Sequence, residues 1–542
     1  MSGESTNQVP PLRGYNVFRT DRALCSALNA FAPSAPTGEL DRIGTDAGSD
    51  ETVALGFAAN ENPPTLHTHD ENGNRIDEVR FHPAWHALLA RATSFGLHAA
   101  AWQDREPLPH LRRAARFYVW SQVESGHGCP ISMTYAAVAS LRKQPDLAEI
   151  WEPRLASREY DPRLSPIRTK SAALCGMGMT EKQGGSDVRA NTTRAVALDR
   201  TGPGRTYALT GHKWFCSAPM SDGFLVLAQA PGGLSCFLVP RALDDGSRNR
   251  FFIVRLKEKL GNRSNASAEI ELEGTHGTLI GDEGHGLAVI LEMVNHTRLD
   301  CMLGSAGLVR QALVQAIHYA QHRRAFGRLL VDQPLMQNVL ADIALESEAA
   351  TWLFMRVALA IDRDEREVQR IGTAVGKYWL CKRAPTLIGE ALECLGGNGY
   401  VEASILPRLY RESPLNSIWE GAGNINALDV LRTLQKPDAY EAMRAQWNAA
   451  FTEPRIAQAA EELETLVARE GDAQERARFV AERAALIWQA SLLLEHAPSA
   501  ISDTFVRCRV GGEGGRALGT LRTGCDLQTI IERAAPTQSD AA

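Results

Sequence analysis

One carboxylate of the chain stands in a setting suited to proton transfer. Glu420 lies between an apolar aromatic pair and a glycine-rich turn, in the segment Ile418-Trp419-Glu420-Gly421-Ala422-Gly423-Asn424. Removal from water raises the pKa of a carboxylate and makes it a stronger base toward a carbon acid. A surface glutamate that caps the next helix is the alternative. The residues alone predict either a general base or a helix cap.

A glycine-rich stretch earlier in the chain is suited to ligand binding. Residues 176–187 read GMGMTEKQGGSD and combine four glycines with hydroxyl groups and an amide. Backbone N–H groups of such a stretch can approach a flat or phosphorylated ligand. The stretch lacks the GxGxxG spacing of a dinucleotide fingerprint and has no Gly-Lys-Ser phosphate loop, which disfavours nicotinamide and ATP. A tight loop without a ligand is the alternative.

Two further motifs have equally plain alternatives. The segment HKWFCS (212–217) places two aromatic residues beside a hydroxyl group, so it can stack on a ring system and hydrogen-bond one of its heteroatoms. Taken by itself it is β-sheet core. The segment GGNGY (396–400) follows an apolar helix and by itself indicates a helix C-cap and a turn.

The elements that must position these motifs form three helical blocks and one β block. Apolar residues recur at helical spacing from Pro83 to about Arg142, and again after Gly286, where positions 336, 340, 343, 347, 350, 354 and 357 form one stripe. Between 171 and 290, short runs rich in Val, Ile, Phe and Leu predict an antiparallel β domain. We expect an N-terminal arm, extended along other surfaces (1–82), a helical domain (83–170), the β domain (171–290), a helical bundle (291–434) and a C-terminal helical domain (435–542).

Composition excludes several classes of protein. The chain has 542 residues with 44% hydrophobic and 23% charged residues, which argues against wholesale disorder. A formal charge of -6 argues against a surface that attracts polyanions everywhere. The ten cysteines include no C-x-x-C pair, so we expect reduced thiols, no metal site and no disulfide framework. Without a signal sequence or a long apolar run, we expect a cytoplasmic protein.

The order and spacing of the motifs resemble the acyl-CoA dehydrogenase flavoprotein family. The shared pieces run from about 83 to 434 and include GMGMTExxGGSD, GxKWFxS, KLGxRxxxS, LIGDEGHGL, RxxFG, LGGNGY and WEGxGN. The resemblance implies an α+β, mainly α fold: an N-terminal helical domain, a middle antiparallel β domain, a helical bundle and an extra C-terminal helical domain. The long N-terminal arm and that extra domain are most similar to members that act in the adaptive response to DNA alkylation.

The resemblance also implies FAD as cofactor, placed between the β domain and the second helical block. Phe215 and Ser217 match the positions beside the isoalloxazine ring. Arg323, Gly396, Gly397 and Asn398 match positions that reach a flavin bound by a neighbouring subunit, which implies at least a dimer and typically a homotetramer. The remaining implied cofactor contacts are Gly178, Met179, Thr180, Gln183, Gly184, Gly185, Ser186, Cys216, Ile418, Trp419, Gly421, Gly423 and Asn424.

Glu420 falls on the catalytic base of the family. The implied reaction removes the α-proton of an acyl-CoA thioester while the β-hydride leaves to the flavin, and it requires donors on the thioester carbonyl. In the family these donors are the backbone N–H of the base and a ribityl hydroxyl. Two departures affect the acyl pocket: KQGGSD stands where members often have PGAGSD, and Trp419 stands where tyrosine is common.

In the most similar members, the C-terminal extension is associated with double-stranded DNA. Residues 431–542 contain 13 basic and 16 acidic residues, a net charge of -3, so the domain as a whole is not basic. A local, phosphate-directed and salt-sensitive face is expected from Arg432, Arg507, Arg509, Arg516 and Arg522. Solvated surface arginines with an oligomer contact are the alternative.

Three hypotheses follow. The first is an FAD-containing protein of the DNA alkylation response, with a retained acyl-CoA dehydrogenase core and sequence-independent binding of duplex DNA. The second is a metabolic acyl-CoA dehydrogenase for branched or unusual acyl groups, in which the last domain serves only assembly. The third is a DNA-binding module with a structural flavin and an idle Glu420.

Overall fold

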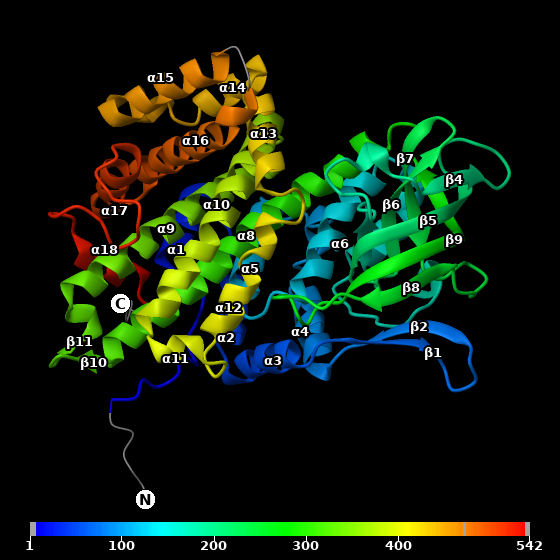
Figure 1. Cartoon of the computed structure of the whole chain (residues 1–542), viewed down its shortest axis with the longest axis horizontal. Coiled ribbons are helices and arrows are strands. Elements are labelled where there is room, and N and C mark those ends of the chain that lie inside the picture. Colours follow the sequence, from blue (N-terminus) through cyan, green and yellow to red (C-terminus); the bar gives the residue numbers. More distant parts are fainter. Residues whose placement is uncertain (1–6, 470–472, 537–542) are drawn as a thin grey trace, which may run out of the picture. The chain divides into compact units, whose positions relative to one another are not determined.

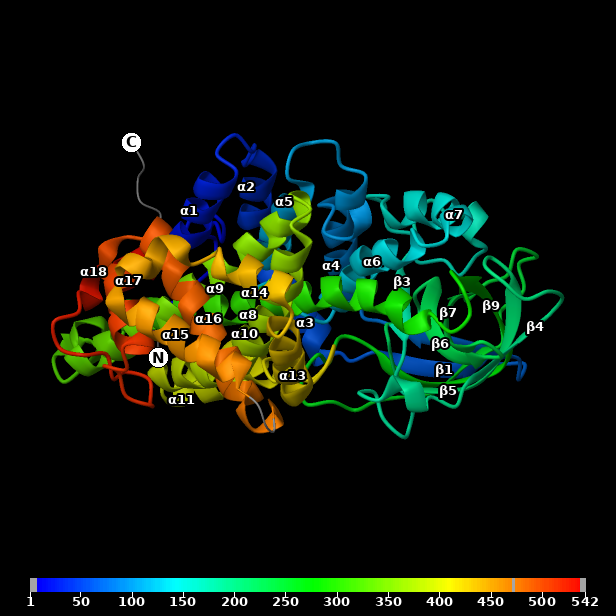
Figure 2. The ribbon, with the colours of Figure 1, turned by 90° about the horizontal axis from the view of Figure 1, so that it is seen from above.

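The helix α9 (Pro334–Asp362) shows how the sequence builds the helical part of the molecule. The predicted stripe is confirmed, because Leu340, Ile343, Phe354 and Val357 are all buried on this helix. Helices α1, α10, α16 and α18 pack against it. Figures 1 and 2 show α9, α10 and α16 running side by side. This computed structural model describes residues 7–469 and 473–536.

The chain divides into two compact units, and the helical one comprises residues 1–53, 110–123 and 298–542. It contains α1 (Arg22–Phe31), α2 (Gly38–Ala47), α5 (Pro109–Ser121), most of α8 (Gly286–His322), α9, α10 (Arg366–Cys394), α11 (Gly397–Tyr400), α12 (Leu406–Glu412), α13 (Gly423–Leu434), α14 (Pro437–Arg444), α15 (Pro454–Ala468), α16 (Ala473–His496), α17 (Ser499–Phe505), α18 (Leu527–Ala534) and the small hairpin β10 (Arg324–Ala325) and β11 (Arg328–Leu329).

The second unit comprises residues 54–109 and 124–297. Its elements are the end of α3 (Asp50–Glu61), the hairpin β1 (Thr65–His69) and β2 (Arg75–Arg80), α4 (Pro83–Ser94), α6 (Gly128–Leu141), α7 (Pro145–Leu155), β3 (Cys175–Gly178), β4 (Arg194–Ala197), β5 (Thr206–Ser217), β6 (Gly223–Ala230), β7 (Gly233–Pro240), β8 (Phe251–Leu256), β9 (Ser267–Ile280) and the start of α8.

The strands of the second unit close into a ring. The order is β3-β6-β4-β5-β9-β7, β6 pairs again with β7, and β8 pairs with β9. Most neighbours are antiparallel, as expected, but β3 and β4 each run parallel to β6. The interior is filled by residues such as Tyr207, Phe224, Phe237 and Ile270. Burying such side chains contributes roughly 1.5–3 kcal/mol each, so the ring is a rigid support for the loops at its rim.

The structure corrects one expectation about the first 80 residues. Residues 22–61 are not an extended arm but include α1, α2 and α3. Each of these helices is short, with Leu24, Leu28 and Ile43 among the few residues that it buries. The buried residues of α1 and α2 do recur at helical spacing, but each run covers only ten residues between segments rich in Pro, Gly and Asn. Within the described part of the chain, no helix is both long and apolar enough to cross a membrane.

Candidate functional site

The glycine-rich loop and the aromatic segment lie together in the second unit. The loop follows β3, and the aromatic segment ends β5. Trp214 donates its backbone N–H to the carbonyl of Thr180 at 2.9 Å, and Lys182 donates its backbone N–H to Nε2 of His212 at 3.0 Å. The structure therefore brings two predicted groups of cofactor residues into contact, although about thirty residues separate them in the sequence.

A buried ion pair fixes the loop to the strand. Nζ of Lys213 lies 2.8 Å from Oε1 of Glu181, and both side chains are fully inaccessible to solvent. Nζ also donates to the carbonyl of Leu227 at 2.7 Å. The Glu181 carboxylate accepts the backbone N–H groups of Thr192 and Thr193 at 2.7 and 3.2 Å. Burial alone would raise the pKa of Glu181, but Lys213 and these hydrogen bonds outweigh it and hold that pKa well below its usual range.

A β-bulge sets which side chains of β5 face outward. Lys213 pairs with Ile270 and Cys216 pairs with Ala268, so β5 has one residue more than β9 over this stretch. Strict alternation would place Phe215 on the same face as buried Lys213. The bulge instead leaves the Phe215 side chain 54% exposed and turns Cys216 into the core. Burial raises the pKa of the Cys216 thiol to about 12, so this predicted cofactor residue offers only its backbone.

Open space beside several glycines makes the residues fit a flat, phosphorylated cofactor. A Cβ atom built on Gly184, Gly396 or Gly397 would meet no atom within 4 Å. The exposed face of Phe215 can stack on a ring system, and Ser217 lies two residues further along the same strand. The donor set on this unit is thus an aromatic ring, hydroxyl groups and backbone N–H groups, as an FAD molecule requires.

The loop with Glu420 lies in the helical unit, between Ser417 and the start of α13. Glu420 has a left-handed backbone with φ of 58°, and Gly421 follows with φ of 101°. A non-glycine residue pays of order 1–3 kcal/mol for such a conformation, which persists only where neighbours enforce it. The Glu420 loop is therefore under strain at the predicted base.

Two cationic side chains enforce the strained loop by binding its carbonyl groups. Arg298 on α8 donates from Nε to the carbonyl of Glu420 at 2.9 Å. Lys377 on α10, 1% exposed, donates from Nζ to the carbonyl of Gly421 at 2.7 Å. Asp429 holds Arg298 in turn at 2.8 Å. Because the N–H of a trans peptide points away from its carbonyl, the N–H groups of Gly421 and Ala422 point away from these two cations.

The surroundings of the Glu420 carboxylate suit a base. Its Oε2 atom is buried from solvent. Trp419 donates from Nε1 to Oδ1 of Asn416 at 2.9 Å, which fixes the indole ring beside the base. Ile418 precedes it with a side chain that is 61% exposed. A carboxylate next to apolar groups, with a backbone N–H at hand, can remove a proton from carbon and stabilise the enolate.

A separate group gathers at the other end of α8. Asn398 donates from Nδ2 to the hydroxyl of Tyr319 at 3.0 Å, and Tyr319 lies one helical turn before Arg323. Arg323 also donates to the carbonyl of Asn7. The structure thus links Asn398 to the last turn of α8, which Arg323 follows.

The arginines predicted to face DNA differ in environment. Arg509 is mostly buried and pairs with Asp342 and Glu346 on α9. Both Arg507 and Arg522 form ion pairs with Glu513: Nη2 of Arg507 and Nη1 of Arg522 lie 3.2 and 3.3 Å from Oε2 of Glu513. Arg432 and Arg516 are exposed. Arg509 is therefore placed as a structural link, whereas the other four remain at the surface.

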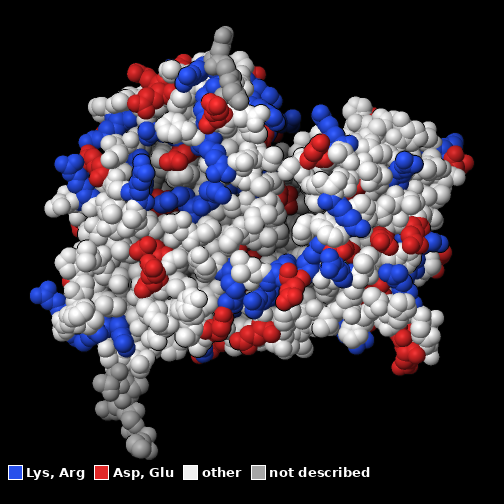
Figure 3. All heavy atoms as spheres, viewed as in Figure 1, with Lys and Arg blue, Asp and Glu red and all other residues white. Residues whose placement is uncertain are grey.

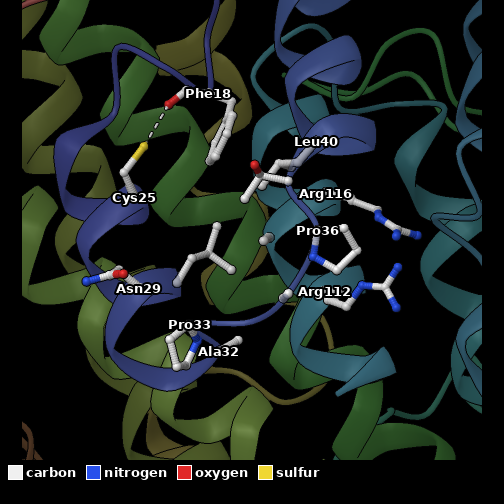
Figure 4. A pocket seen from close by; sticks show the side chains of 13 residues that line it. Phe18, Cys25, Asn29, Ala32, Pro33, Pro36, Leu40, Arg112 and Arg116 are labelled. Carbon is white, nitrogen blue, oxygen red and sulfur yellow. Dashed lines mark hydrogen bonds between the residues drawn. The ribbon is translucent and has the colours of Figure 1, made fainter. Parts of the chain in front are cut away.

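The helical unit also contains a cavity of about 150 Å³ between α1, the turn before α2 and α5. Figure 4 shows Phe18, Cys25, Leu40, Arg112 and Arg116 around it. None of the predicted catalytic, cofactor or DNA residues lines this cavity. Among the described residues, no group of His, Cys, Asp and Glu could hold a metal ion.

Sequence reasoning missed the residues that hold the two loops. Glu181 lies in the glycine-rich stretch and Lys213 in the aromatic segment, but the sequence predicted no role for either side chain. Lys377 and Arg298 lie on helices that carry several other charged residues, so no local signal in the sequence distinguishes them. Arg455, which shares Glu513 with Arg507 and Arg522, was also missed.

Comparison with known families agrees with these features. Three family models match the chain: the adaptive response protein AidB N-terminal domain over residues 7–162, the acyl-CoA dehydrogenase middle domain over 176–275, and the acyl-CoA dehydrogenase C-terminal domain over 284–435. The chain is 49% identical to the putative acyl-CoA dehydrogenase AidB of Escherichia coli over 436 residues, covering 79% of this chain and 80% of the relative. It is 32% identical to acyl-CoA dehydrogenase family member 11 of Caenorhabditis elegans, covering 77% and 70%.

Two solved structures are similar over most of the chain. The apo form of Bd2924 has a TM-score of 0.83 at 29% identity and covers 91% of this chain and all of its own. Caenorhabditis elegans ACDH-11 in complex with C11-CoA has a TM-score of 0.82 at 26% identity, covering 99% and 94%. The predicted fold class is confirmed by these similarities and by the helices and strands themselves.

Proposed function

Since the chain belongs to the acyl-CoA dehydrogenase family, in its AidB-like branch, we propose that it is an FAD-dependent oxidoreductase that introduces a double bond into an acyl-CoA thioester. The observation that carries this proposal is the Glu420 loop, in which a strained carboxylate residue has both adjoining carbonyls bound by buried cations. FAD, when bound, supplies the acceptor for the β-hydride.

The chain's own residues account for the other half of the reaction. Glu420 accepts the α-proton of the thioester. The backbone N–H of Glu420 donates to the thioester carbonyl as negative charge develops there, while Arg298 and Lys377 hold the loop by the carbonyls of Glu420 and Gly421. Met179 to Ser186, Phe215 and Ser217 hold the cofactor from the β unit. Ile418 and Trp419 exclude water from the base.

The test is reduction of the bound flavin by substrate. Mixing the purified flavin-loaded protein with isovaleryl-CoA should bleach the flavin absorbance, and Glu420→Gln should slow bleaching by roughly 10²–10⁴-fold, the usual contribution of a general base. Glu441→Gln, an exposed glutamate of α14, is the matched control. A protein that binds FAD but is bleached by no acyl-CoA thioester would refute the dehydrogenase proposal and favour a structural flavin.

A second function, contact with duplex DNA in the alkylation response, is favoured by one charge cluster. Arg455, Arg507 and Arg522 surround the carboxylate of Glu513, and Arg455 also pairs with Glu453, so one positive charge is left over. Arg516 is exposed in the same loop region. Figure 3 shows Lys and Arg side chains gathered over α10 and α16 on this face of the helical unit. Such a cluster would bind phosphates without reading base sequence.

Salt titration tests this proposal. Replacing Arg455, Arg507 and Arg522 by alanine should weaken retention of duplex DNA at low salt at least tenfold and flatten the dependence on salt concentration. Arg444→Ala on α14 is the control. Unchanged retention in the triple variant would exclude the cluster as a DNA contact and leave the metabolic alternative.

Assembly into a homotetramer is proposed on the exposed apolar residues of the helical unit. Phe326 at the tip of the β10–β11 hairpin is 99% exposed, and Leu335 and Tyr400 are also largely exposed. Large exposed apolar side chains indicate surfaces that bind other chains. Light scattering should report a tetramer for the wild type and smaller species for Phe326→Ser with Tyr400→Ser. A wild-type monomer would contradict the proposal.

A further inference from the structure

The C-terminal helical domain reaches the Glu420 loop through one side chain. Arg478 on α16 donates from Nε to Oδ1 of Asn424 at 2.8 Å. Asn424 is the second residue of α13, four positions after the base. Helices α13 and α16 pack against each other, so this bond lies at a built helix interface. The predicted cofactor residue Asn424 is therefore bonded to α16, which lies outside the residues that the acyl-CoA dehydrogenase family models match.

The chemistry of the two side chains fixes the orientation of the asparagine. A guanidinium group carries only donors, so the Asn424 amide must turn its oxygen toward Arg478. Its NH₂ group is then directed to the other side as a donor. A donor at this position suits the acceptor atoms of a dinucleotide, its phosphate oxygens and ring nitrogens.

A second cation stands at the same place. A Cβ atom built on Gly423 would lie 3.6 Å from Nζ of Lys382 and 3.8 Å from Nη2 of Arg478. Gly423 is the first residue of α13, and the preceding residue supplies no side-chain cap. Two cations next to the positive end of a helix repel its dipole, and a bound pyrophosphate would offset that repulsion.

We propose that Arg478 is a positioning residue for FAD, which acts by fixing the amide of Asn424, and that the C-terminal domain is thereby part of the cofactor site. The inference rests on the proposed function and deepens it. It predicts that cofactor affinity depends on a residue outside the segments that the dehydrogenase models match. DNA contact by this domain is not required for the effect.

The experiment measures the affinity of the apoprotein for FAD by fluorescence quenching. Arg478→Ala should raise the FAD Kd about tenfold, the value of one charge-assisted hydrogen bond. Arg478→Lys should recover part of the loss. Arg483→Ala, on the same helix and paired with Glu462, should leave the Kd unchanged. The melting temperature of the apoprotein should not change in Arg478→Ala, because this side chain is exposed.

A double-mutant cycle with Asn424→Ala tests the route. If Arg478 acts through the amide, Arg478→Ala should have little further effect on FAD affinity in the Asn424→Ala background. An unchanged Kd in Arg478→Ala, an additive cycle, or a lower apoprotein melting temperature with normal FAD affinity would each overturn the inference. A wild-type protein that binds no FAD would instead refute the proposed function, so the two failures are distinguishable.

Discussion

The two candidate loops, one in each unit, are held in place by opposite charges. In the β unit, the buried carboxylate of Glu181 accepts hydrogen bonds from the backbone N–H groups of Thr192 and Thr193. It also forms an ion pair with Lys213. In the helical unit, two cations, Arg298 and Lys377, bind the carbonyls of Glu420 and Gly421. The anchors in the helical unit therefore bind the backbone of the loop itself, whereas in the β unit a side chain of the loop binds its neighbours.

The difference follows from which part of each loop is held. The Glu420 loop has a strained backbone, and cations that bind its carbonyls keep that conformation in place. The glycine-rich loop is held by its own side chain, because Glu181 accepts N–H groups from the segment 192–193 and pairs with Lys213 on β5. The sign of the anchor thus follows from whether backbone carbonyls or a carboxylate side chain of the loop is bound.

The largest expected effect comes from breaking the anchor of the β unit. Lys213→Met leaves Glu181 buried without its counter-ion and should destabilise this unit by about 3–5 kcal/mol, with loss of bound FAD. Thermal unfolding and the flavin spectrum measure both effects. Lys182→Met, its exposed neighbour, is the control. A stable, flavin-loaded Lys213→Met protein would contradict the proposed role of the ion pair.

Acid should weaken the same anchor. The folded pKa of Glu181 lies below that of the unfolded chain, so its stabilisation is present above about pH 4.5 and is lost as the pH falls below that value. The gap in melting temperature between wild type and Glu181→Gln should therefore be full at pH 7, corresponding to about 2–3 kcal/mol, and narrow below pH 4.5. A gap that does not depend on pH would exclude the ionised pair.

Removing Lys377, an anchor of the helical unit, should lower stability less than the loss of Lys213 does, but it should slow the reaction with substrate. Lys377→Met deletes one charge-assisted hydrogen bond, worth about 1.5–3 kcal/mol, and should slow substrate bleaching of the flavin about ten- to hundredfold. Lys436→Met, exposed after the end of α13, is the control. If Lys377→Met lowered stability but left the bleaching rate unchanged, the link between this cation and the N–H donor would fail.

Alanine substitution of one glycine in each loop should give the smallest changes in stability. A Cβ atom on Gly185 would lie 2.5 Å from Oγ1 of Thr180 and 3.2 Å from its Cβ, so the loop would have to move. Gly185→Ala should therefore destabilise the β unit by about 1–3 kcal/mol. On Gly423 the same atom would meet only ordinary contacts, and Gly423→Ala should change stability by less than about 0.5 kcal/mol. Equal melting shifts would show that the two loops are equally tight.

The sequence predicted the fold class and the order of the blocks because long helices carry a strong periodic signal. The α9 stripe is the clearest case, with Leu340, Ile343 and Phe354 buried as expected. The helices α1 to α3 were missed because each spans only 10 to 12 residues and the segments between them are rich in Pro, Gly and Ser. Parallel pairing of β3 and β4 with β6 also escaped, since short strands show composition but not partner or direction.

The sequence proposed residues for the candidate site but not their geometry. Residue type and order pointed to Glu420 and the glycine-rich loop. The bulge that exposes Phe215 and buries Cys216 depends on the register between β5 and β9, which no local pattern in either strand reveals. The anchors Lys377 and Arg298 come from helices distant in sequence, and Arg509 looked like a surface cation until Asp342 and Glu346 were found beside it.

The left-handed backbone of Glu420 has a consequence for how the protein can change. Glycine adopts this conformation at little cost, so Glu420→Gly would relax the chain while deleting the base. Selection for thermal stability alone would therefore favour glycine at position 420, and the protein would lose its proposed base. Stability and the proposed catalysis thus favour different residues at this one position.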